Sequence, residues 1–486
     1  MRGMVYSFVG ISLWSMVYLV CQVKPPEANS KDRFVPVPGP ASGEDFIYLN
    51  GEPFVLVGIR PRGDTHRIQL CDKQGRVAWT HRLGEEEQLG QARLSPDGKY
   101  LVYDYFVVET SRGWIAPHER VPYRGGIRCV RRDGSIAWEI PSRGVCEGAP
   151  VYSPEGAVEQ VVSNRILILK HSWESLVRAT VRDFAGRRLL TVDLSAPTTS
   201  ATTAALFPDG SHLVVSKQTG DPDEVWVRLM RVDGGIVWHI VGARLPGYDP
   251  VEWFHPPHSY MLLEVCSWQH FLRSLRHESQ PVPKHETRVR EDSRDGHLAL
   301  ITREGKLVWT GRWRFDTEKE PVPILQDEGK DVSWGAANWD EYRQMMAQRG
   351  SQVTILWNRG SHRRLLTLDS PGRGRGALVL QRVAALSAAR PHEKSVLSPD
   401  GRLVAIYRIS RNGNTGMLHV HFWNRSGRLI SEAVMPGLPL DDSGIPGYPD
   451  KVWISADNRY LVVWIRSDAS HSDGYCVVQI APSDLP

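Results

Sequence analysis

The sequence predicts an all-β fold assembled from repeated four-stranded units, and three observations lead to this prediction. The first is a tight-turn motif, Ser-Pro-Asp-Gly, that returns along the chain between two apolar strands. The second is a hairpin with a tryptophan four residues after its turn glycine, and it occurs four times. The third is composition, because 43 glycines, 33 prolines and 17 tryptophans in 486 residues are typical of many short strands joined by turns.

The Ser-Pro-Asp-Gly motif has a physical reason to form a tight turn. Proline presets φ at the second position, aspartate suits the third, and glycine accepts the left-handed conformation that closes the turn. An apolar strand precedes the motif and another follows it, as in Ala92–Tyr103. The motif and its variants stand at residues 95–98, 153–156, 207–210, 398–401 and 455–458.

The tryptophan hairpin supplies the second half of each unit. It is seen in Cys129–Trp138, and its four tryptophans are Trp79, Trp138, Trp238 and Trp309. Each unit therefore has four strands, which we letter a to d, with tight turns at a–b and c–d. Strands such as Leu213–Val215 are apolar on both faces, so each sheet has to be covered on both sides. Radial packing meets this demand and predicts a β-propeller.

Units begin near residues 44, 91, 148, 203, 250, 322, 392 and 450, which predicts eight blades. Seven blades are the alternative, if the unit near residue 322 is not a blade. The last unit stops after strand c, at about Tyr475–Ile480. Phe34–Val37 precedes the first unit and is expected to supply the missing strand, which would close the ring and remove its exposed edges.

These motifs resemble known propeller families over about residues 44–482. The Ser-Pro-Asp-Gly hairpins are similar to those of WD-repeat and Tol-system-type propellers. The Asp-Gly-x-Ile/Val-x-Trp half resembles the repeat of quinoprotein-like (PQQ-like) propellers, and this resemblance implies that the tryptophans dock against the adjacent blade. The chain lacks the adjacent cysteine pair of the true quinoprotein dehydrogenases. The tryptophans are therefore expected to be structural, with no cofactor, and the fold alone implies no single function.

The N-terminus carries a targeting signal. No residue from Gly3 to Val23 is charged and most are apolar, with Arg2 before the segment and Lys24 after it. Residues 1–23 are predicted to be an apolar helix that acts as a signal-anchor or a signal peptide, followed by a Pro-rich linker at 24–43 and the propeller at 44–486. Lipidation of Cys21 is a third alternative, although Val20 precedes it where lipoproteins prefer a small residue. All three alternatives place the propeller outside the cytoplasm, at the membrane or secreted.

Charge and cysteine content exclude several classes of protein. The formal charge is only +4, with acidic and basic residues interleaved, which argues against a nucleic-acid partner. Five further cysteines, scattered through separate units without a C-x-x-C pair, favour neither a disulfide framework nor a metal site. The predicted protein is a monomeric propeller that contacts a membrane through its N-terminal segment.

Long insertions interrupt the repeat at about residues 111–124, 269–295, 337–351 and 370–391. The third is predicted to hold a helix, because Asn338 and Glu341 form a capping-box-like pair and Gly350 stands at the far end. All insertions are assigned to the face that carries the b–c and d–a loops, where propellers usually bind. Two further d–a loops are predicted at Pro246–Tyr248 and Pro446–Tyr448, which share a Pro-Gly-Tyr sequence. Aromatic and histidine residues of the insertions and of these two loops are the candidate binding residues: Trp114, His118, Tyr123, Tyr248, His277, His285, Tyr342 and Tyr448.

The sequence carries no catalytic motif that we recognise, so three functions from different classes remain. The favoured one is a non-catalytic binding module that presents its b–c/d–a face to a protein or a glycan. The second is a propeller enzyme, a lyase or glycosidase with its site at the channel mouth. The third is an envelope assembly scaffold, which the resemblance suggests because the quinoprotein-like group includes an eight-bladed outer-membrane-assembly lipoprotein.

Overall fold

The computed structural model describes most of the propeller. The described residues are 34–37, 40–60, 65–108, 120–147, 150, 153–172, 175–194, 201–218, 225–245, 260–275, 296–315, 323–327, 330–333, 342–349, 351–359, 362–369, 378–386, 393–440, 447–466 and 473–480. The predicted apolar helix at 1–23 lies outside them.

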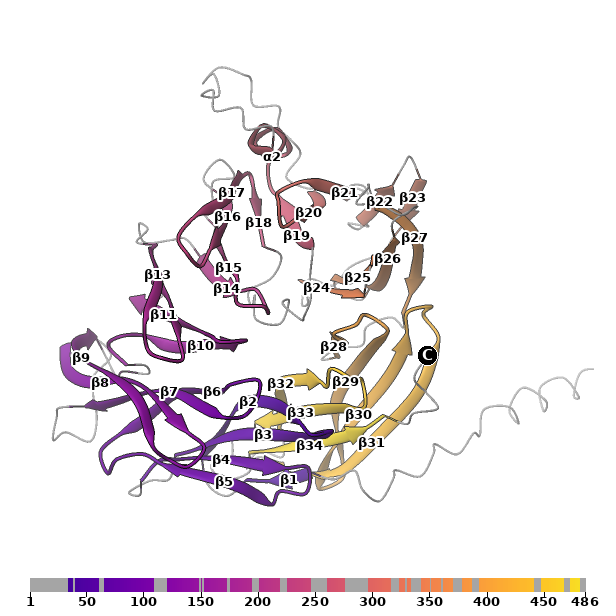
Figure 1. Cartoon of the computed structure of the whole chain (residues 1–486). Coiled ribbons are helices and arrows are strands. Elements are labelled where there is room, and N and C mark those ends of the chain that lie inside the picture. The colour runs from indigo at the N-terminus through magenta and orange to yellow at the C-terminus, as the bar shows by residue number, and fades with distance from the viewer. Residues whose placement is uncertain are drawn as a thin grey trace, which may run out of the picture.

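The described chain forms eight antiparallel sheets arranged as the blades of a ring (Figure 1). Seven sheets have four strands and the fifth has six, so the predicted all-β class and eight-blade architecture are confirmed. The first four blades, each from strand a to strand d, are β2 (Ala41–Leu49), β3 (Glu52–Ile59), β4 (Arg67–Asp72) and β5 (Val77–Arg82); β6 (Gln88–Leu94), β7 (Tyr100–Val108), β8 (Arg120–Arg131) and β9 (Ile136–Glu147); β10 (Ala157–Val162), β11 (Arg165–Ser172), β12 (Ser175–Asp183) and β13 (Arg188–Asp193); and β14 (Ala201–Leu206), β15 (His212–Gln218), β16 (Trp226–Arg231) and β17 (Ile236–Val241).

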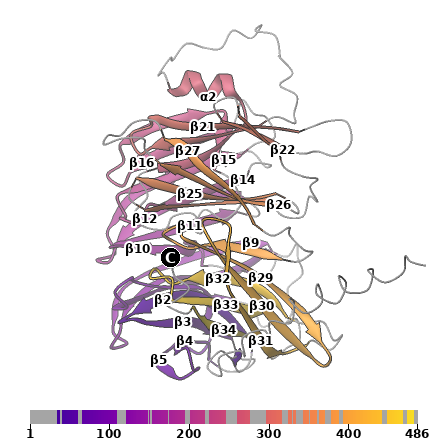
Figure 2. The same cartoon turned by 90° about the vertical axis from the view of Figure 1, so that its right-hand side faces the viewer.

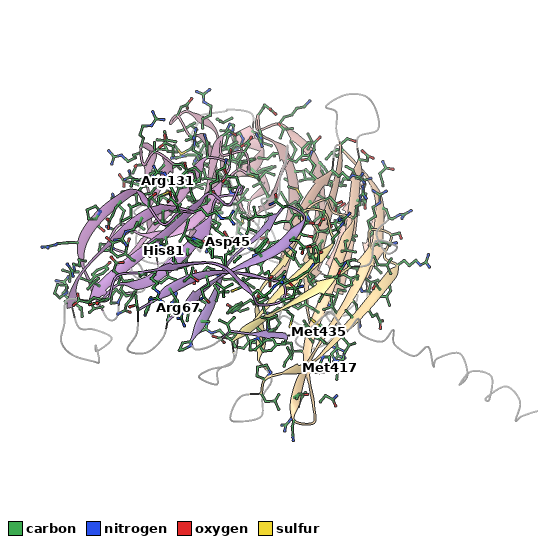
Figure 3. All side chains as sticks on the ribbon, turned by 60° about the horizontal axis from the view of Figure 1, so that its bottom comes forward. Asp45, Arg67, His81, Arg131, Met417 and Met435 are labelled. Atoms are coloured by element: carbon green, nitrogen blue, oxygen red, sulfur yellow. The ribbon has the colours of Figure 1, made fainter. Side chains whose placement is uncertain are left out.

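The second half of the ring follows the same plan. Its blades are β18 (Ala243–Arg244), β19 (Tyr260–Val265), β20 (Gly296–Thr302) and β21 (Leu307–Phe315), extended by β22 (Pro323–Asp327) and β23 (Lys330–Ser333); β24 (Tyr342–Arg349), β25 (Gln352–Arg359), β26 (His362–Asp369) and β27 (Val379–Ala385); β28 (Lys394–Leu397), β29 (Leu403–Asn412), β30 (Thr415–Asn424) and β31 (Leu429–Leu438); and β32 (Tyr448–Ile454), β33 (Tyr460–Arg466), β34 (Gly474–Gln479) and β1 (Phe34–Pro36). Strand a is innermost in each blade. Figure 3 labels Asp45 on inner strand β2 of blade 1, and Arg67 and His81 on its outer strands β4 and β5.

The two ends of the chain meet in blade 8. Strand β1 pairs antiparallel with β34, from Phe34 opposite Cys476 to Pro36 opposite Gly474. In Figure 1, indigo β1 lies beside the yellow strands of the C-terminal blade. The ring is therefore closed by hydrogen bonds between strands that are far apart in the sequence.

The hydrophobic core lies between the blades rather than in one central mass. One cluster of buried residues joins blades 1 and 2 and includes Leu56 and Tyr103. Another joins blade 8 to blade 1 and includes Val57 and Trp464. Each sheet is apolar on both faces because each face packs against a neighbouring blade.

The Ser-Pro-Asp-Gly motif forms the tight turn that its residues predict. In blade 2, Gly98 N donates to Ser95 O at 2.8 Å and Ser95 Oγ donates to Asp97 Oδ1 at 2.7 Å. Gly98 has a φ of 67°, which explains why glycine stands there. The same serine hydroxyl accepts a hydrogen bond from Tyr100 N at 2.9 Å, which fixes the start of the next strand.

Three tryptophans of strand d link blades 1, 2 and 4 to the blade that follows each, whereas Trp309 Nε1 in blade 5 has no hydrogen-bond partner among the described residues. Trp79 Nε1 donates to Arg132 O at 2.9 Å, and Trp138 Nε1 donates to Phe184 O at 2.9 Å. Trp238 Nε1 likewise donates to Arg303 O, at 3.0 Å. Each acceptor lies in the c–d turn of the following blade, so these indoles act as links between blades.

Trp238 also packs against Gly305 in the c–d turn of blade 5. A Cβ added to Gly305 would lie 2.9 Å from Trp238 Cδ1, and Gly305 has a φ of 82°. We expect Gly305→Ala to lower the free energy of unfolding by about 2 to 3 kcal/mol, from backbone strain and displacement of the indole. Urea denaturation monitored by tryptophan fluorescence measures this.

Gly234 is the matched control for this substitution. It occupies the same turn position with a φ of 96°, and a Cβ there would meet nothing within 4 Å. Blade 3, which precedes it, has Leu190 where blades 1, 2, 4 and 5 have tryptophan. Gly234→Ala should cost only the strain, about 1 kcal/mol. Equal losses in the two variants would show that the indole does not link the blades.

Blade 6 differs from its prediction. The helix expected within residues 337–351 is wrong, because Tyr342–Arg349 forms strand β24 and pairs along its length with β25. Its residues have high helix propensity, but inter-blade burial of Met346, Ala347 and Gln348 outweighs that preference. Asn338 and Glu341 lie outside the described residues.

The long connections do not all lie at one end of the ring. Strand β18 begins at Ala243, so Pro246–Tyr248 belongs to an a–b connection rather than a d–a loop. The predicted insertion at 370–391 contains strand β27, which makes 370–378 a c–d connection. The assignment of every insertion to the b–c/d–a face is therefore wrong at these two places. At 370–391 the reason is the period, since β22 and β23 extend blade 5 and shift the following unit by about twenty residues. At Pro246–Tyr248 the reason is the inner strand of blade 5, β18, which is only two residues long and stands before the predicted start of the unit.

One helix is described. Helix α2 (Trp268–Leu275) lies in the b–c connection of blade 5, at the periphery of the ring beside blade 4 (Figures 1 and 2). Phe271 anchors it, because its side chain is fully buried among residues of blades 4 and 5. Within the described ranges no helix is long and apolar enough to cross a bilayer.

Candidate functional site

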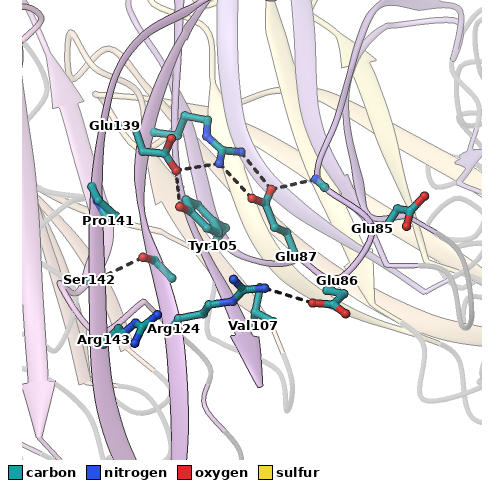
Figure 4. A pocket seen from close by; sticks show the side chains of 13 residues that line it. Glu85, Glu86, Glu87, Tyr105, Val107, Arg124, Glu139, Pro141, Ser142 and Arg143 are labelled. Atoms are coloured by element: carbon teal, nitrogen blue, oxygen red, sulfur yellow. Dashed lines mark hydrogen bonds and ion pairs between the residues drawn. The ribbon is translucent and has the colours of Figure 1, made fainter. Parts of the chain in front are cut away.

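A pocket of about 850 Å³ opens between blades 1 and 2, at the end of the ring that carries the b–c and d–a connections (Figure 4). One wall is the d–a connection of blade 1, which holds the consecutive residues Glu85, Glu86 and Glu87. The other wall is the face of the blade 2 sheet that looks toward blade 1. The pocket lies at the rim of the propeller, not at its central channel.

Strand register places the residues of the second wall in rows. Residues directly opposite in adjacent strands share one face of a sheet, and so do residues two apart along a strand. The rows across β7, β8 and β9 are Tyr103, Arg128 and Glu139; Tyr105, Gly126 and Pro141; and Val107, Arg124 and Arg143.

Arg128 organises the inner end of the pocket. Its two terminal nitrogens each donate to Glu87 at 2.9 Å, and Nη2 also donates to Glu139 at 2.8 Å. Its guanidinium lies over the Tyr105 ring, 4.4 Å from the centroid. The side chains of Arg128 and Glu87 are 13% and 16% exposed, so this charged cluster is largely shielded from water. Glu87 thereby ties the loop of blade 1 to the sheet of blade 2.

The protonation states in this cluster are settled by its hydrogen bonds. Burial alone would raise the pKa of Glu139, but hydrogen bonds from Tyr105 and Arg128 lower it below its usual value. Burial and the hydrogen bond to Glu139 raise the pKa of Tyr105. Glu139 is therefore ionised and Tyr105 is neutral near pH 7, and Tyr105 donates its hydroxyl proton to the Glu139 carboxylate.

Tyr103 contacts Arg128 directly, and His81 in turn contacts Tyr103. Burial raises the pKa of Tyr103 to about 12, and its hydroxyl accepts a hydrogen bond from Arg128 Nη1 at 2.9 Å. The same hydroxyl lies 2.9 Å from Nε2 of His81, whose pKa is lowered by burial and by Arg128. His81 is thus neutral near pH 7, and its Nε2 shares a hydrogen bond with the Tyr103 hydroxyl. The inner end of the pocket is a rigid wall in which each described charge has a partner.

Gly126 is required for this wall. A Cβ at Gly126 would lie 2.5 Å from Ile140 O and 3.0 Å from the Tyr105 hydroxyl. Any side chain there would therefore displace Tyr105 from Glu139. A glycine in the middle of a strand marks such a close approach.

The outer end of the pocket is more exposed. Arg124 Nη2 lies 3.2 Å from Glu86 Oε2, with side-chain exposures of 51% and 73%. Arg143, directly opposite Arg124 in the register, is exposed as well. This end has charged groups that water and a ligand can reach.

Asp104 lies on the opposite face of the same sheet and connects blades 2 and 3. Its carboxylate accepts hydrogen bonds from the backbone N–H groups of Gln91 at 3.0 Å, Val158 at 3.1 Å and Ser153 at 3.2 Å. The side chain is fully buried. Burial raises the pKa of Asp104 to about 7, although these three donors oppose the shift.

This shift predicts a pH-dependent stability. The folded-state pKa lies above the unfolded value, so the contribution of Asp104 is complete at acidic pH and is lost as pH rises toward 7 and beyond. Between about pH 5 and about pH 8 the loss should be about 2 kcal/mol. We expect Asp104→Asn to remove this part of the pH dependence, measured as the difference in urea-unfolding free energy from wild type. An unchanged pH profile in the variant would show that Asp104 does not titrate in this range.

The structure places three of the eight predicted site residues. Tyr123 is half-buried on β8 and points to the blade 3 side of the sheet, away from the pocket. Tyr448 is 42% exposed at the start of β32 in blade 8, and Tyr342 begins β24 in blade 6. These three residues lie in three different blades and do not form one site. Trp114, His118, Tyr248, His277 and His285 lie outside the described residues.

Sequence reasoning missed the residues that line the pocket. Arg128, Tyr105 and Glu139 are strand residues, and they converge only through the pairing of three strands. One signal was available: the run Glu85–Glu87 stands in a d–a connection, where a short acidic segment next to a basic strand indicates a paired surface.

Metal binding has no support in the described chain. Its residues contain no group of three or more His, Cys, Asp or Glu side chains arranged to hold an ion.

Comparisons with known proteins assign no family to this chain. No family model matches the chain, and no curated protein matches it. Among solved structures it is similar to oligopeptidase B from Leishmania major, with 10% identity, a TM-score of 0.42, and coverage of 91% of this chain and 54% of that one. The chain thus spans about half the length of that oligopeptidase.

Two smaller propellers are similar over most of their length. Oligogalacturonate lyase from Vibrio parahaemolyticus has 9% identity and a TM-score of 0.38, with coverage of 92% of this chain and 100% of that one. The WD40 domain of coronin from Toxoplasma gondii has 6% identity and a TM-score of 0.38, with coverage of 95% and 87%. At these values the comparisons assign no activity.

Proposed function

We propose that this protein is an extracytoplasmic, non-catalytic β-propeller that binds a protein or a glycan through the b–c/d–a end of the ring, at the pocket between blades 1 and 2. The single observation that carries the proposal is the Arg128 cluster. Glu87, Glu139 and Tyr105 hold its guanidinium from three sides, which makes one wall of the pocket rigid before any ligand arrives. Preorganisation of this kind reduces the entropy lost on binding.

The same cluster favours binding over catalysis. A general acid or base works best with a pKa near the operating pH. Here hydrogen bonds hold the pKa of Glu139 below its usual value, and burial raises that of Tyr105. The carboxylate and phenol at the rigid inner end are therefore fixed in one protonation state at neutral pH.

The location outside the cytoplasm is proposed from the uncharged segment Gly3–Val23. A reporter enzyme that is active only outside the cytoplasm, fused after Pro486, tests it directly. Reporter activity is expected with the whole chain, and its absence would contradict the proposed location.

Kinship with quinoprotein-like propellers is proposed on the docking of Trp79, Trp138 and Trp238 against the next blade. We propose no bound cofactor on the basis of this kinship.

Site-specific photo-crosslinking tests the binding function in cells that express the protein naturally. A photoreactive residue replaces Val145, which is 64% exposed and lies two residues beyond Arg143 on the same face of β9. The matched control replaces Val77, which is 49% exposed at the opposite, c–d end of blade 1. We expect a crosslinked species from position 145 and none from position 77. Crosslinking at neither position, or equally at both, would contradict the proposed binding face.

A further inference from the structure

We infer that the outer end of this pocket receives an acidic side chain from a peptide segment of a partner protein, held between Arg124 and Arg143. This inference rests on the proposed binding function and names the ligand chemistry of the same pocket. The partner segment carries one or two Asp or Glu residues among neutral or basic neighbours.

The positions of the two arginines favour a carboxylate ligand. Arg124 on β8 and Arg143 on β9 stand directly opposite each other and on the same face of the sheet. Opposite residues in an antiparallel pair have Cβ atoms about 5 Å apart, and like charges placed so are destabilising. A carboxylate between the two guanidinium groups would remove this repulsion and accept hydrogen bonds from both.

The protein's own acidic loop, Glu85–Glu87, occupies part of this site. Glu86, from the d–a connection of blade 1, lies 3.2 Å from Arg124. Both side chains are more than half exposed, so the pair contributes little to stability and a ligand carboxylate could replace Glu86. In the part of the chain that the structure describes, the Arg143 side chain makes no hydrogen bond or ion pair. One arginine is thus available and the other is held loosely.

The residues that line the pocket favour a peptide over other anionic ligands. Sugar rings are usually bound against an exposed aromatic face, but the pocket's only described aromatic ring, Tyr105, is 7% exposed and covered by Arg128. Glu85, Glu87 and Glu139 line the rest of the pocket and would repel a ligand with many charges, such as a nucleic acid. Pro141 and Val107 add an apolar surface between the charges. A peptide with an isolated acidic side chain fits this mixed lining.

The test uses the full-length protein and a phage-displayed library of random dodecapeptides. The peptide recovered most often is labelled with fluorescein, and its affinity is measured by fluorescence anisotropy. We expect the recovered sequences to share an Asp or Glu. Arg143→Ala should weaken binding about ten-fold, as should Arg124→Ala, and Glu86→Gln should strengthen it about three-fold.

Arg132→Ala is the matched control. Arg132 is an exposed arginine at the other end of the same hairpin, so its substitution changes the net charge equally but should leave the affinity unchanged. Circular dichroism of each variant checks the fold. Recovered peptides without a shared acidic residue, or equal losses in Arg132→Ala and Arg143→Ala, would overturn the inference.

A uronic-acid trisaccharide provides the second arm. We expect it to compete weakly with the labelled peptide, and tighter binding of the trisaccharide would overturn the peptide assignment in favour of an acidic glycan. The outcome also separates this inference from the function it rests on. If position 145 crosslinks a partner and Arg143→Ala leaves the yield unchanged, the binding function stands and the arginine site falls.

Discussion

Replacing Val35 with aspartate is expected to lower the free energy of unfolding by about 3 to 5 kcal/mol, because a charge would enter the seam that closes the ring. Val35 is 6% exposed at the centre of β1, opposite Tyr475 in the pairing with β34. It belongs to the hydrophobic cluster between blades 8 and 1, which also includes Trp464. A carboxylate there would be buried within this apolar cluster and would force β1 off the sheet.

Loss of β1 has a second consequence. Strand β34 would become the edge of a three-stranded sheet, with unpaired backbone groups that attract other chains. We therefore expect Val35→Asp also to aggregate at lower temperature than wild type, measured by light scattering during heating.

Val145→Asp is the matched control for this prediction. It makes the same chemical change in a strand, but at a side chain that is 64% exposed. The expected change in unfolding free energy is within about 0.5 kcal/mol. Urea denaturation compares the two variants, and equal stability of Val35→Asp and Val145→Asp would show that β1 does not close the propeller.

Replacing Arg363 with methionine is expected to cost about 3 to 5 kcal/mol, because it leaves a buried carboxylate without its main cation. The Arg363 side chain is 0% exposed and its Nη1 lies 3.0 Å from Glu393 Oε2, while Glu393 is 5% exposed. A second nitrogen of Arg363 donates to the Glu393 backbone carbonyl at 2.7 Å. Arg408 stands farther from the carboxylate, at 3.7 Å, and replaces only part of this interaction.

The double variant separates the charge from the packing. Arg363→Met with Glu393→Met removes both charges and should recover at least half of the lost stability, because a buried ion pair gains little over apolar residues of similar size. Arg231→Met is the control for an exposed pair, since Arg231 and Asp233 are 60% and 66% exposed, and it should cost less than about 1 kcal/mol. A single variant Arg363→Met as stable as Arg231→Met would contradict the buried-pair argument.

Local sequence was sufficient to predict most of the architecture. The turn at Ser95–Gly98 depends on four consecutive residues, so its hydrogen bonds could be anticipated from their types. The tryptophan repeat behaved in the same way, because a fixed spacing from the turn glycine brings the indoles of Trp79, Trp138 and Trp238 to the same place in the next blade. Seven of the eight blades carry at least one of these motifs, and the spacing of the units supplied the eighth.

Prediction failed where tertiary contacts outweighed local preference. Tyr342–Arg349 has helix-forming residues and no Ser-Pro-Asp-Gly turn, yet it is an inner strand because two neighbouring blades bury it. The extra hairpin of β22 and β23 has no counterpart in the other blades, and it displaced the unit boundaries assigned to blade 6.

The candidate site shows the same division between local and long-range information. Turn chemistry and strand periodicity are properties of residues close together in the chain, and they determine the class of fold. The pocket depends on Glu87, Arg128 and Glu139, which come from a loop of one blade and two strands of the next. Their convergence is set by strand register and by the packing of blade against blade, so it emerged only when the ring was assembled.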